Sequence, residues 1–291
     1  MLTEGLSNFN YRVDFDSGDE PVVLRIYGRD PKVCQKEVDL LRLLRETVPV
    51  PEVLRVYANG FDGVGPFIVL RYVEGITFRQ LRRTGDEEAV AQAARSIGET
   101  LAAFHRHTFA ERGTLGAGPA VTDHFLNGPN AIPEFIDSCL ASPTLRRRLD
   151  ERTRDRVHTL AWSRSPELAR FQDENCLVHG DFGNRNVLVR RERGRWRVAA
   201  VIDWEFAVAG SPLFDIASFL RYERRLAPSR EPRFSQGYER GGGKLSEDWR
   251  RLARIVDLTR LCEILAQEKL PADVVIEVAE LVRETTEDNS I

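Results

Sequence analysis

The sequence predicts a two-lobed α+β fold, with a small antiparallel sheet and one helix followed by a larger, mainly helical lobe. Three observations predict this division. Short strand-like runs occupy the first quarter of the chain. Apolar residues recur every three to four positions over most of the remainder. In the second half, two apolar strands each end in a group of polar and acidic residues. We therefore expect one lobe at residues 1–73 and another at residues 74–291.

The N-terminal lobe is expected to contain a hairpin, a helix and a further strand. Residues 11–15, 22–27 and 67–72 have the composition of strands, and a turn sequence lies between the first two. Residues 31–46 place apolar side chains on one broad helical face, and Pro49 and Pro51 end that pattern. One helix should therefore interrupt a small sheet.

The C-terminal lobe is expected to be mainly helical, because its apolar residues follow the helical period. Residues 241–243, three consecutive glycines, indicate a turn between helices. The chain from 177 to 190 and from 195 to 203 is expected to form a short hairpin. The predicted helices cover residues 87–107, 132–139, 143–162, 249–267 and 272–285.

Composition excludes some classes of partner and site. A net charge of −3 provides no long-range attraction to nucleic acid, so we expect none as a partner. The four cysteines are too widely spaced for a zinc site, which favours reduced thiols. No leader sequence and no apolar run of about 18 residues is present, so we expect no membrane association and a cytoplasmic location. A monomer and a homodimer are both compatible with the sequence.

The most informative segment is a polar loop between two apolar strands. It contains His179, Gly180 and Asp181, with Asn186 five residues after Asp181. A later apolar strand, residues 198–202, leads directly into Asp203. Two acids are therefore predicted to lie at neighbouring strand ends.

These residue types suit phosphoryl transfer. The charge of a nucleotide is offset by Mg²⁺, which takes oxygen ligands from one or two carboxylates or amides and from phosphates. Asn186 and Asp203 fit the ligand role. A separate carboxylate must accept the proton of the attacking hydroxyl, and Asp181 fits that role.

The two motifs, His179-Gly180-Asp181 with Asn186 and Ile202-Asp203-Trp204-Glu205, resemble those of the aminoglycoside phosphotransferase family. These are small-molecule kinases of the protein-kinase-like fold, related to choline kinases. The resemblance implies that ATP or GTP is the co-substrate, with Mg²⁺, and that the acceptor is a small hydroxylated molecule. It covers nearly the whole chain.

The resemblance also implies roles for residues of the N-terminal lobe, with arginine at a position where the family usually has lysine. A nucleotide-covering loop, an ion pair facing the phosphates and a hinge whose backbone holds the purine are expected. The residues concerned are Gly5, Ser7 and Asn8 in the loop, Arg25 and Glu37 in the ion pair, and Arg71 and Val73 in the hinge.

Other polar residues are expected to have supporting roles. His179 should anchor the backbone of its loop, and Asp215 should support that loop from the helix after the metal motif. His105 and His107 lie near the end of a predicted helix, where interaction with the helix dipole explains them.

The acceptor is not specified by any motif. An aminoglycoside-type antibiotic, a macrolide, a choline-like compound and another hydroxylated metabolite all remain open. A cationic acceptor is favoured by a scattered set of acids, although such acids usually face solvent. They are Asp123, Glu134, Asp137, Glu205 and Glu223.

Two alternative functions compete with transfer. A nucleotide-binding pseudokinase is suggested by Arg25 and by the short segment before Gly5, but Asp181, Asn186 and Asp203 are all present. A two-metal phosphoesterase would need more histidine and carboxylate ligands than the sequence groups together. Phosphoryl transfer is therefore the favoured interpretation.

Overall fold

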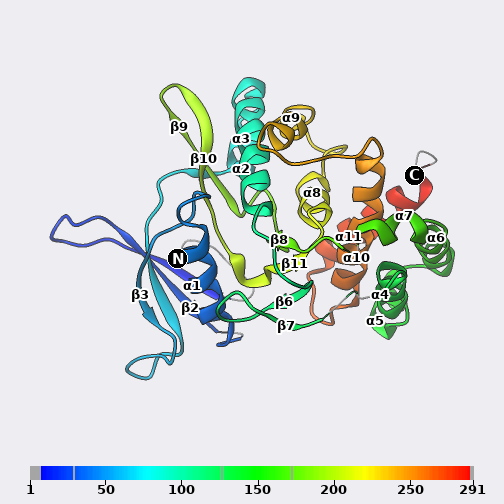
Figure 1. Ribbon diagram of the computed structural model, residues 1–291, viewed down its shortest axis with the longest axis horizontal. Coiled ribbons are helices and arrows are strands. Elements are labelled where there is room, and N and C mark those ends of the chain that lie inside the picture. The colour runs from blue at the N-terminus through cyan, green and yellow to red at the C-terminus, as the bar shows by residue number, and fades with distance from the viewer. Residues whose placement is uncertain (1–7, 29, 125, 127, 172, 289–291) are drawn as a thin grey trace.

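The computed structural model describes residues 8–28, 30–124, 126, 128–171 and 173–288. A small sheet with helix α1 lies at one end of its long axis, and most of the helices lie at the other end (Figure 1). The predicted α+β class is confirmed. Among the described residues, no helix is both long and apolar enough to cross a membrane.

The N-terminal lobe is a four-stranded antiparallel sheet in the order β1-β2-β4-β3, with α1 packed against it. Strand β3 was not predicted, since it is a five-residue strand at the sheet edge with no clear alternation of buried and exposed residues. The elements are β1 (Asn8–Val13), β2 (Val22–Tyr27), α1 (Val33–Leu44), β3 (Val53–Tyr57) and β4 (Phe67–Arg71).

Strand β2 lies inside this sheet and presents two polar residues to the interior. Arg25 is paired in register with Asn10 on one side and Ile68 on the other. Arg25 and Tyr27, two residues apart, share one face of the strand and are both buried. The centre of the sheet therefore carries a buried cation.

The five helices predicted by range for the C-terminal lobe are present, one of them divided, and three shorter helices at residues 78–83, 165–168 and 233–240 were not predicted. The helix predicted over residues 143–162 is two helices, because Leu149 is extended and Asp150 caps the second one through the Thr153 amide, at 2.9 Å. The α-helices are α2 (Phe78–Arg83), α3 (Glu87–His105), α4 (Ala131–Leu140), α5 (Pro143–Arg148), α6 (Glu151–Ser163), α7 (Ser165–Leu168), α8 (Leu213–Leu220), α9 (Arg233–Arg240), α10 (Trp249–Ala266) and α11 (Ala272–Glu287). Short 3-10 helices are η1 (Ala169–Phe171) and η2 (Trp204–Phe206).

Two small sheets carry the polar loops. One has the order β10-β9-β5 and the other the order β7-β6-β11-β8. The predicted hairpin was wrong in its first part, because β8 pairs with β11 and only β9 and β10 pair with each other. The strands are β5 (Ile76–Thr77), β6 (Gly113–Leu115), β7 (Val121–Asp123), β8 (Cys176–Val178), β9 (Val187–Glu192), β10 (Arg195–Val201) and β11 (Val208–Gly210). The segment 179–186 thus bridges two sheets.

The chain leaves the N-terminal sheet at the end of β4 and joins the C-terminal lobe through β5, which pairs with β9. The predicted division at residue 73 falls between these two strands.

All four cysteines are free, in agreement with the predicted reduced state. Burial raises the pKa of the Cys34 thiol to about 11, so this thiol is unreactive near neutral pH.

Helix α3 is the centre of the C-terminal lobe, and its contact with α9 depends on two glycines. A Cβ atom on Gly98 would lie 2.1 Å from the Phe234 carbonyl oxygen. A Cβ atom on Gly237 would lie 2.1 Å from the Arg95 carbonyl oxygen. The two helices therefore pack backbone against backbone.

Gly98→Ala is expected to lower the free energy of unfolding by about 1–3 kcal/mol, because the added methyl group meets a backbone that cannot move aside. In an ordinary helix interior, the same change would stabilise by about 1 kcal/mol. Urea denaturation measures the difference. Gly65→Ala is the matched control, because Gly65 has no atom within 4 Å of an added Cβ. An increase in stability for Gly98→Ala would contradict the packing described.

Candidate active site

The loop after β8 is held by the buried carboxylate of Asp215 in α8. The His179 amide donates to Asp215 Oδ2 at 2.7 Å, and the Gly180 amide donates to Oδ1 at 3.0 Å. Gly180 has φ +79°, and an added Cβ would lie 2.3 Å from the Phe206 carbonyl oxygen. Only glycine fits there without displacing the backbone. The expected supporting role of Asp215 is confirmed by these hydrogen bonds.

The imidazole of His179 links this loop to the loop after β10. Its Nε2 lies 3.0 Å from the Ile202 carbonyl oxygen, and the Asp181 amide donates to its Nδ1 at 3.3 Å. These partners assign the ring proton to Nε2. The expected role of His179 as a backbone anchor is confirmed.

His105 has a role that the sequence did not indicate, and the helix-dipole explanation for it was wrong. The residue is buried, with Nε2 3.3 Å from Asp215 Oδ2 and Nδ1 3.0 Å from the Tyr238 hydroxyl. Burial lowers the pKa of His105, and Asp215 only partly opposes that effect. A neutral imidazole therefore completes the set of donors around Asp215.

Asp181, Asn186 and Asp203 are brought together by these two loops. The Asn186 side-chain amide donates to the Asp181 carbonyl oxygen at 2.9 Å and to Asp181 Oδ2 at 3.0 Å. The Ile202 amide donates to the Asn186 carbonyl oxygen at 3.0 Å. Asp203 is the next residue after Ile202, so this bond brings it close to Asn186. Three residues chosen from separate motifs thus lie at one site.

Asp203 has a left-handed backbone conformation, with φ 71° and ψ 61°. Non-glycine residues rarely adopt this conformation, and it is concentrated at functional sites. Its side chain is 30% exposed, and Oδ1 accepts a hydrogen bond from Arg25 at 2.5 Å. The carboxylate is therefore both held in place and accessible.

Arg25 forms an ion pair with two carboxylates from different lobes. Its Nε donates to Glu37 Oε2 at 2.8 Å, and its other contact is to Asp203. Burial alone lowers the pKa of Arg25, but Glu37 and Asp203 reverse this and raise it above its ordinary value. The guanidinium group stays charged in the interior. The predicted pair of Arg25 with Glu37 is present in the structure.

Glu37 joins helix α1 to both sides of the site. The Tyr27 hydroxyl donates to Oε2 at 2.6 Å, and the Trp204 amide donates to Oε1 at 3.2 Å. With Arg25 also bound, three donors surround a carboxylate whose side chain is 2% exposed. The position of α1 is thereby coupled to the segment that carries Asp203.

A second polar contact between the lobes involves Glu205 and was not foreseen. The Asn8 side chain donates to Glu205 Oε2 at 2.8 Å, and Lys36 Nζ donates to the Glu205 carbonyl oxygen at 2.8 Å. Burial raises the pKa of Glu205, with Asp203 adding to the effect. Burial lowers the pKa of Lys36 to about 8. Glu205 therefore contacts the N-terminal lobe, whereas the sequence interpretation left it among scattered acids that either face solvent or favour a cationic acceptor.

The other residues predicted to bind nucleotide lie elsewhere in the N-terminal lobe or outside the described residues. The Arg71 amide donates to the Glu52 carbonyl oxygen at 2.9 Å, and its guanidinium group contacts Glu52 and Glu20. Val73 lies in the segment between β4 and β5. The predicted loop residues Gly5 and Ser7 lie outside the described residues.

The donor set fits Mg²⁺. Asn186 uses its side-chain NH₂ group for Asp181, so its amide oxygen is available, and Asp203 supplies an accessible carboxylate. Within the described part of the chain, no cluster of three or more His, Cys, Asp or Glu side chains could hold a metal. Few protein oxygens are typical of Mg²⁺ sites completed by water and phosphate, so Asn186 and Asp203 are suitable ligands.

A buried ion pair that the sequence interpretation missed lies near Asp181, in the C-terminal lobe. Arg221 makes two short contacts with Asp257, at 2.7 and 2.9 Å. Burial alone lowers the pKa of Arg221, but Asp257 raises it above its ordinary value, with a smaller contribution from Asp181. A positive charge therefore lies near the predicted base. No sequence motif marks this pair, because its members are 36 residues apart, Arg221 directly after α8 and Asp257 within α10.

Comparison with known proteins gives consistent results. The model of the Phosphotransferase enzyme family matches residues 2–255. The chain is 25% identical over 235 residues to hygromycin-B 4-O-kinase of Escherichia coli, which covers 78% of this chain and 63% of that protein. It is 30% identical over 173 residues to acyl-CoA dehydrogenase family member 11 of Gallus gallus, covering 58% of this chain and 20% of that protein. The chain thus spans about a fifth of the length of this dehydrogenase relative.

Solved structures show the same fold. Aminoglycoside phosphotransferase APH(4)-Ia matches with a TM-score of 0.68 and 20% identity, over 98% of this chain and 90% of that one. A GDP complex of a variant of aminoglycoside 2'-phosphotransferase-IIIa matches with a TM-score of 0.73 and 20% identity, over 99% and 91% of the two chains. The predicted two-lobed fold is confirmed.

Asp215→Asn is expected to lower the free energy of unfolding by about 3 kcal/mol, because a buried NH₂ group would replace one of the oxygens that accept N–H groups. Urea denaturation of the variant and parent measures this. Asp123→Asn is the matched control, because Asp123 is exposed at the end of β7. Equal stability of the Asp215 variant and the control would rule out the described role.

Proposed function

Because the chain belongs to the Phosphotransferase enzyme family, we propose that it transfers the γ-phosphoryl group of ATP or GTP to a hydroxyl of a small molecule. The observation that carries the proposal is the convergence of Asp181, Asn186 and Asp203 at one site between the lobes. Phosphoryl transfer depends mainly on positioning and on stabilising charge, and these residues supply both.

Asp181 is the proposed base. Its Oδ2 is held by the Asn186 amide at 3.0 Å, which leaves Oδ1 to accept the proton of the acceptor hydroxyl. Asp181 lies on the loop that Asp215 holds rigid, so the orientation of its carboxylate is fixed before substrate binds. A positioned base of this kind contributes about 10²- to 10⁴-fold to the rate.

Nucleotide binding is assigned to the N-terminal lobe. Arg25 is the proposed phosphate contact, since its guanidinium group faces Asp203 and can donate to phosphate oxygens in the same way. Gly5, Ser7 and Asn8 are proposed to cover the phosphates, Glu37 to hold Arg25, and the backbones of Arg71 and Val73 to hold the purine. Complexes of similar proteins with ADP and with GDP support a nucleotide co-substrate.

Asn186 and Asp203 would hold Mg²⁺. When bound, the ion would neutralise charge on the phosphates of the nucleotide. Asp203 is supported in this role by Arg25, whose hydrogen bond to Oδ1 orients the carboxylate. Asn186 is oriented by its two contacts with Asp181, so one amide links the base to the metal site.

The acceptor is proposed to be an aminoglycoside-type compound or a similar hydroxylated metabolite. Similar proteins have been solved in complexes with hygromycin B and with kanamycin. Three of the acids considered for a cationic acceptor have internal partners. Asp137 binds His158 and Trp162, Glu223 binds Arg230, and Glu205 binds Asn8.

A direct screen identifies both substrates. ADP or GDP release from the purified chain is measured with ATP and GTP across aminoglycosides, macrolides, amino alcohols and sugars. Phosphorylation of one acceptor class supports transfer. Nucleotide binding without turnover on any acceptor would favour the pseudokinase alternative.

Asp181→Asn is expected to lower turnover by about 10²- to 10⁴-fold, because an amide cannot accept the hydroxyl proton. Nucleotide affinity should change little, since Asp181 is assigned to the acceptor. Steady-state kinetics and calorimetric titration with nucleotide separate the two effects. Asp155→Asn, on the exposed face of α6, is the control. Unchanged turnover in Asp181→Asn would exclude it as the base.

Asp203→Asn is expected to remove most of the magnesium dependence of nucleotide binding, because a neutral amide is a weaker Mg²⁺ ligand than a carboxylate. Calorimetric titration with ATP, with and without magnesium, tests this in parent, variant and Asp155→Asn. The same ratio of affinities in parent and Asp203→Asn would argue against the metal role.

A further inference from the structure

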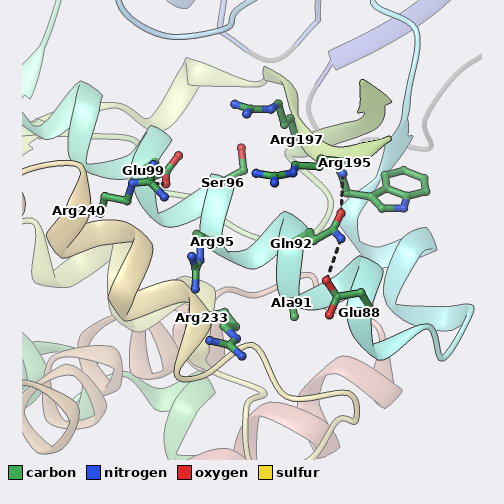
Figure 2. Close-up of a pocket in the computed structure, with 11 residues that line it drawn as sticks. Glu88, Ala91, Gln92, Arg95, Ser96, Glu99, Arg195, Arg197, Arg233 and Arg240 are labelled. Atoms are coloured by element: carbon green, nitrogen blue, oxygen red, sulfur yellow. Dashed lines mark hydrogen bonds and ion pairs between the residues drawn. The ribbon is translucent and has the colours of Figure 1, made fainter. Parts of the chain in front are cut away.

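A cavity lies away from the proposed active site, on the outer face of the C-terminal lobe. Its volume is about 390 Å³, and it is formed by α3, β10 and α9 (Figure 2). None of its lining residues belongs to the site around Asp181. They are Glu88, Ala91, Gln92, Arg95, Ser96, Glu99, Arg195, Trp196, Arg197, Arg233 and Arg240.

The lining is strongly basic although the chain as a whole is weakly acidic. Five arginines and two glutamates line the cavity, whereas the whole chain has a net charge of −3. The arginines come from three different elements, so they meet only in the folded protein. Figure 2 shows Arg195 and Arg197 extending from β10 across α3 toward Ser96, with Arg95 and Arg233 further along the cavity.

Internal carboxylates neutralise few of these arginines. Arg240 lies 3.6 Å from Glu99, the one ion pair within the lining. Arg95 and Arg233 both donate to the neutral side chain of Gln236, each at 3.2 Å. Glu88 accepts from Gln92 at 2.8 Å.

Among the arginines of the cavity, Arg195 and Arg197 are the most available to bind an external partner. In the part of the chain that the structure describes, neither side chain makes a hydrogen bond, ion pair or ring contact. They lie two residues apart on β10, so their side chains leave the same face of the strand. Two guanidinium groups on one face of a strand, without a carboxylate beside them, repel each other, and an anion between them would relieve this repulsion.

We propose that this cavity binds a small anion with two or more phosphate or carboxylate groups. Guanidinium groups donate paired N–H bonds in a geometry that matches phosphate and carboxylate oxygens. The spread of arginines along the cavity favours several anionic groups over one. A single inorganic phosphate would reach only part of the lining.

The cavity is built on elements that lead into the active site. Helix α3 ends at His105, which contacts Asp215, and β10 leads into Asp203. An anion held between α3 and β10 would therefore bridge two elements whose ends position the loops of the site. The binding itself does not depend on phosphoryl transfer, so it is testable in the absence of any acceptor.

The test is calorimetric titration of the full chain with tripolyphosphate and, separately, with citrate. Arg195→Gln combined with Arg197→Gln is expected to weaken binding by about 100-fold, because each lost charge-assisted hydrogen bond costs about tenfold. Arg146→Gln combined with Arg147→Gln is the matched control, since it removes the same charge from exposed positions on α5. Binding should also weaken with added salt.

The possible results distinguish binding in this cavity from binding at another site. Binding to the parent and the α5 control, with loss in the β10 variant, supports the proposal, and the tighter anion identifies the preferred group. Absence of binding to the parent overturns it. Equal binding in the β10 variant also overturns it, because the anion then binds at another place, for example at the proposed nucleotide site. Arg233→Gln provides a second variant on α9 should the double variant be unstable.

Discussion

The buried carboxylate of Asp215 is the interaction on which the site depends. It accepts hydrogen bonds from the His179 and Gly180 amides and is approached by His105, so it joins α8, α3 and the loop after β8. A buried carboxylate is costly unless donors surround it, and here they come from two separate segments, the loop after β8 and α3. The same contacts that satisfy Asp215 therefore fix the loop that carries Asp181 and Asn186.

The second constraint is ionic and connects the lobes. Arg25 lies between Glu37 and Asp203, and Glu37 also accepts from Trp204 next to Asp203. The charge of Arg25 is offset by Glu37 of α1 and by Asp203 of the other lobe. Lobe position and the orientation of Asp203 are thus coupled through one group of side chains.

The sequence was sufficient to predict the long periodic helices, the strand holding Arg25 and the residues of the polar loops. Those predictions rest on local pattern and on motif spacing. It was not sufficient for β3, for the pairing of β8 with β11, or for the contacts of His105, Glu205 and Arg221. Each of these depends on residues distant along the chain, and a charged residue carries no local signal of whether it will be buried or which partner it will meet.

The glycine contact between α3 and α9 has a consequence for recognition at the outer face. At Gly98 and Gly237 no side chain separates the backbones of the two helices, so their separation at these positions cannot easily change. The distance between the backbone positions that carry the arginines of α3 and α9 is consequently fixed by the fold. Anions would be selected by the distance between their charged groups, and the entropy lost on binding would come from ordering the arginine side chains and not from moving the helices.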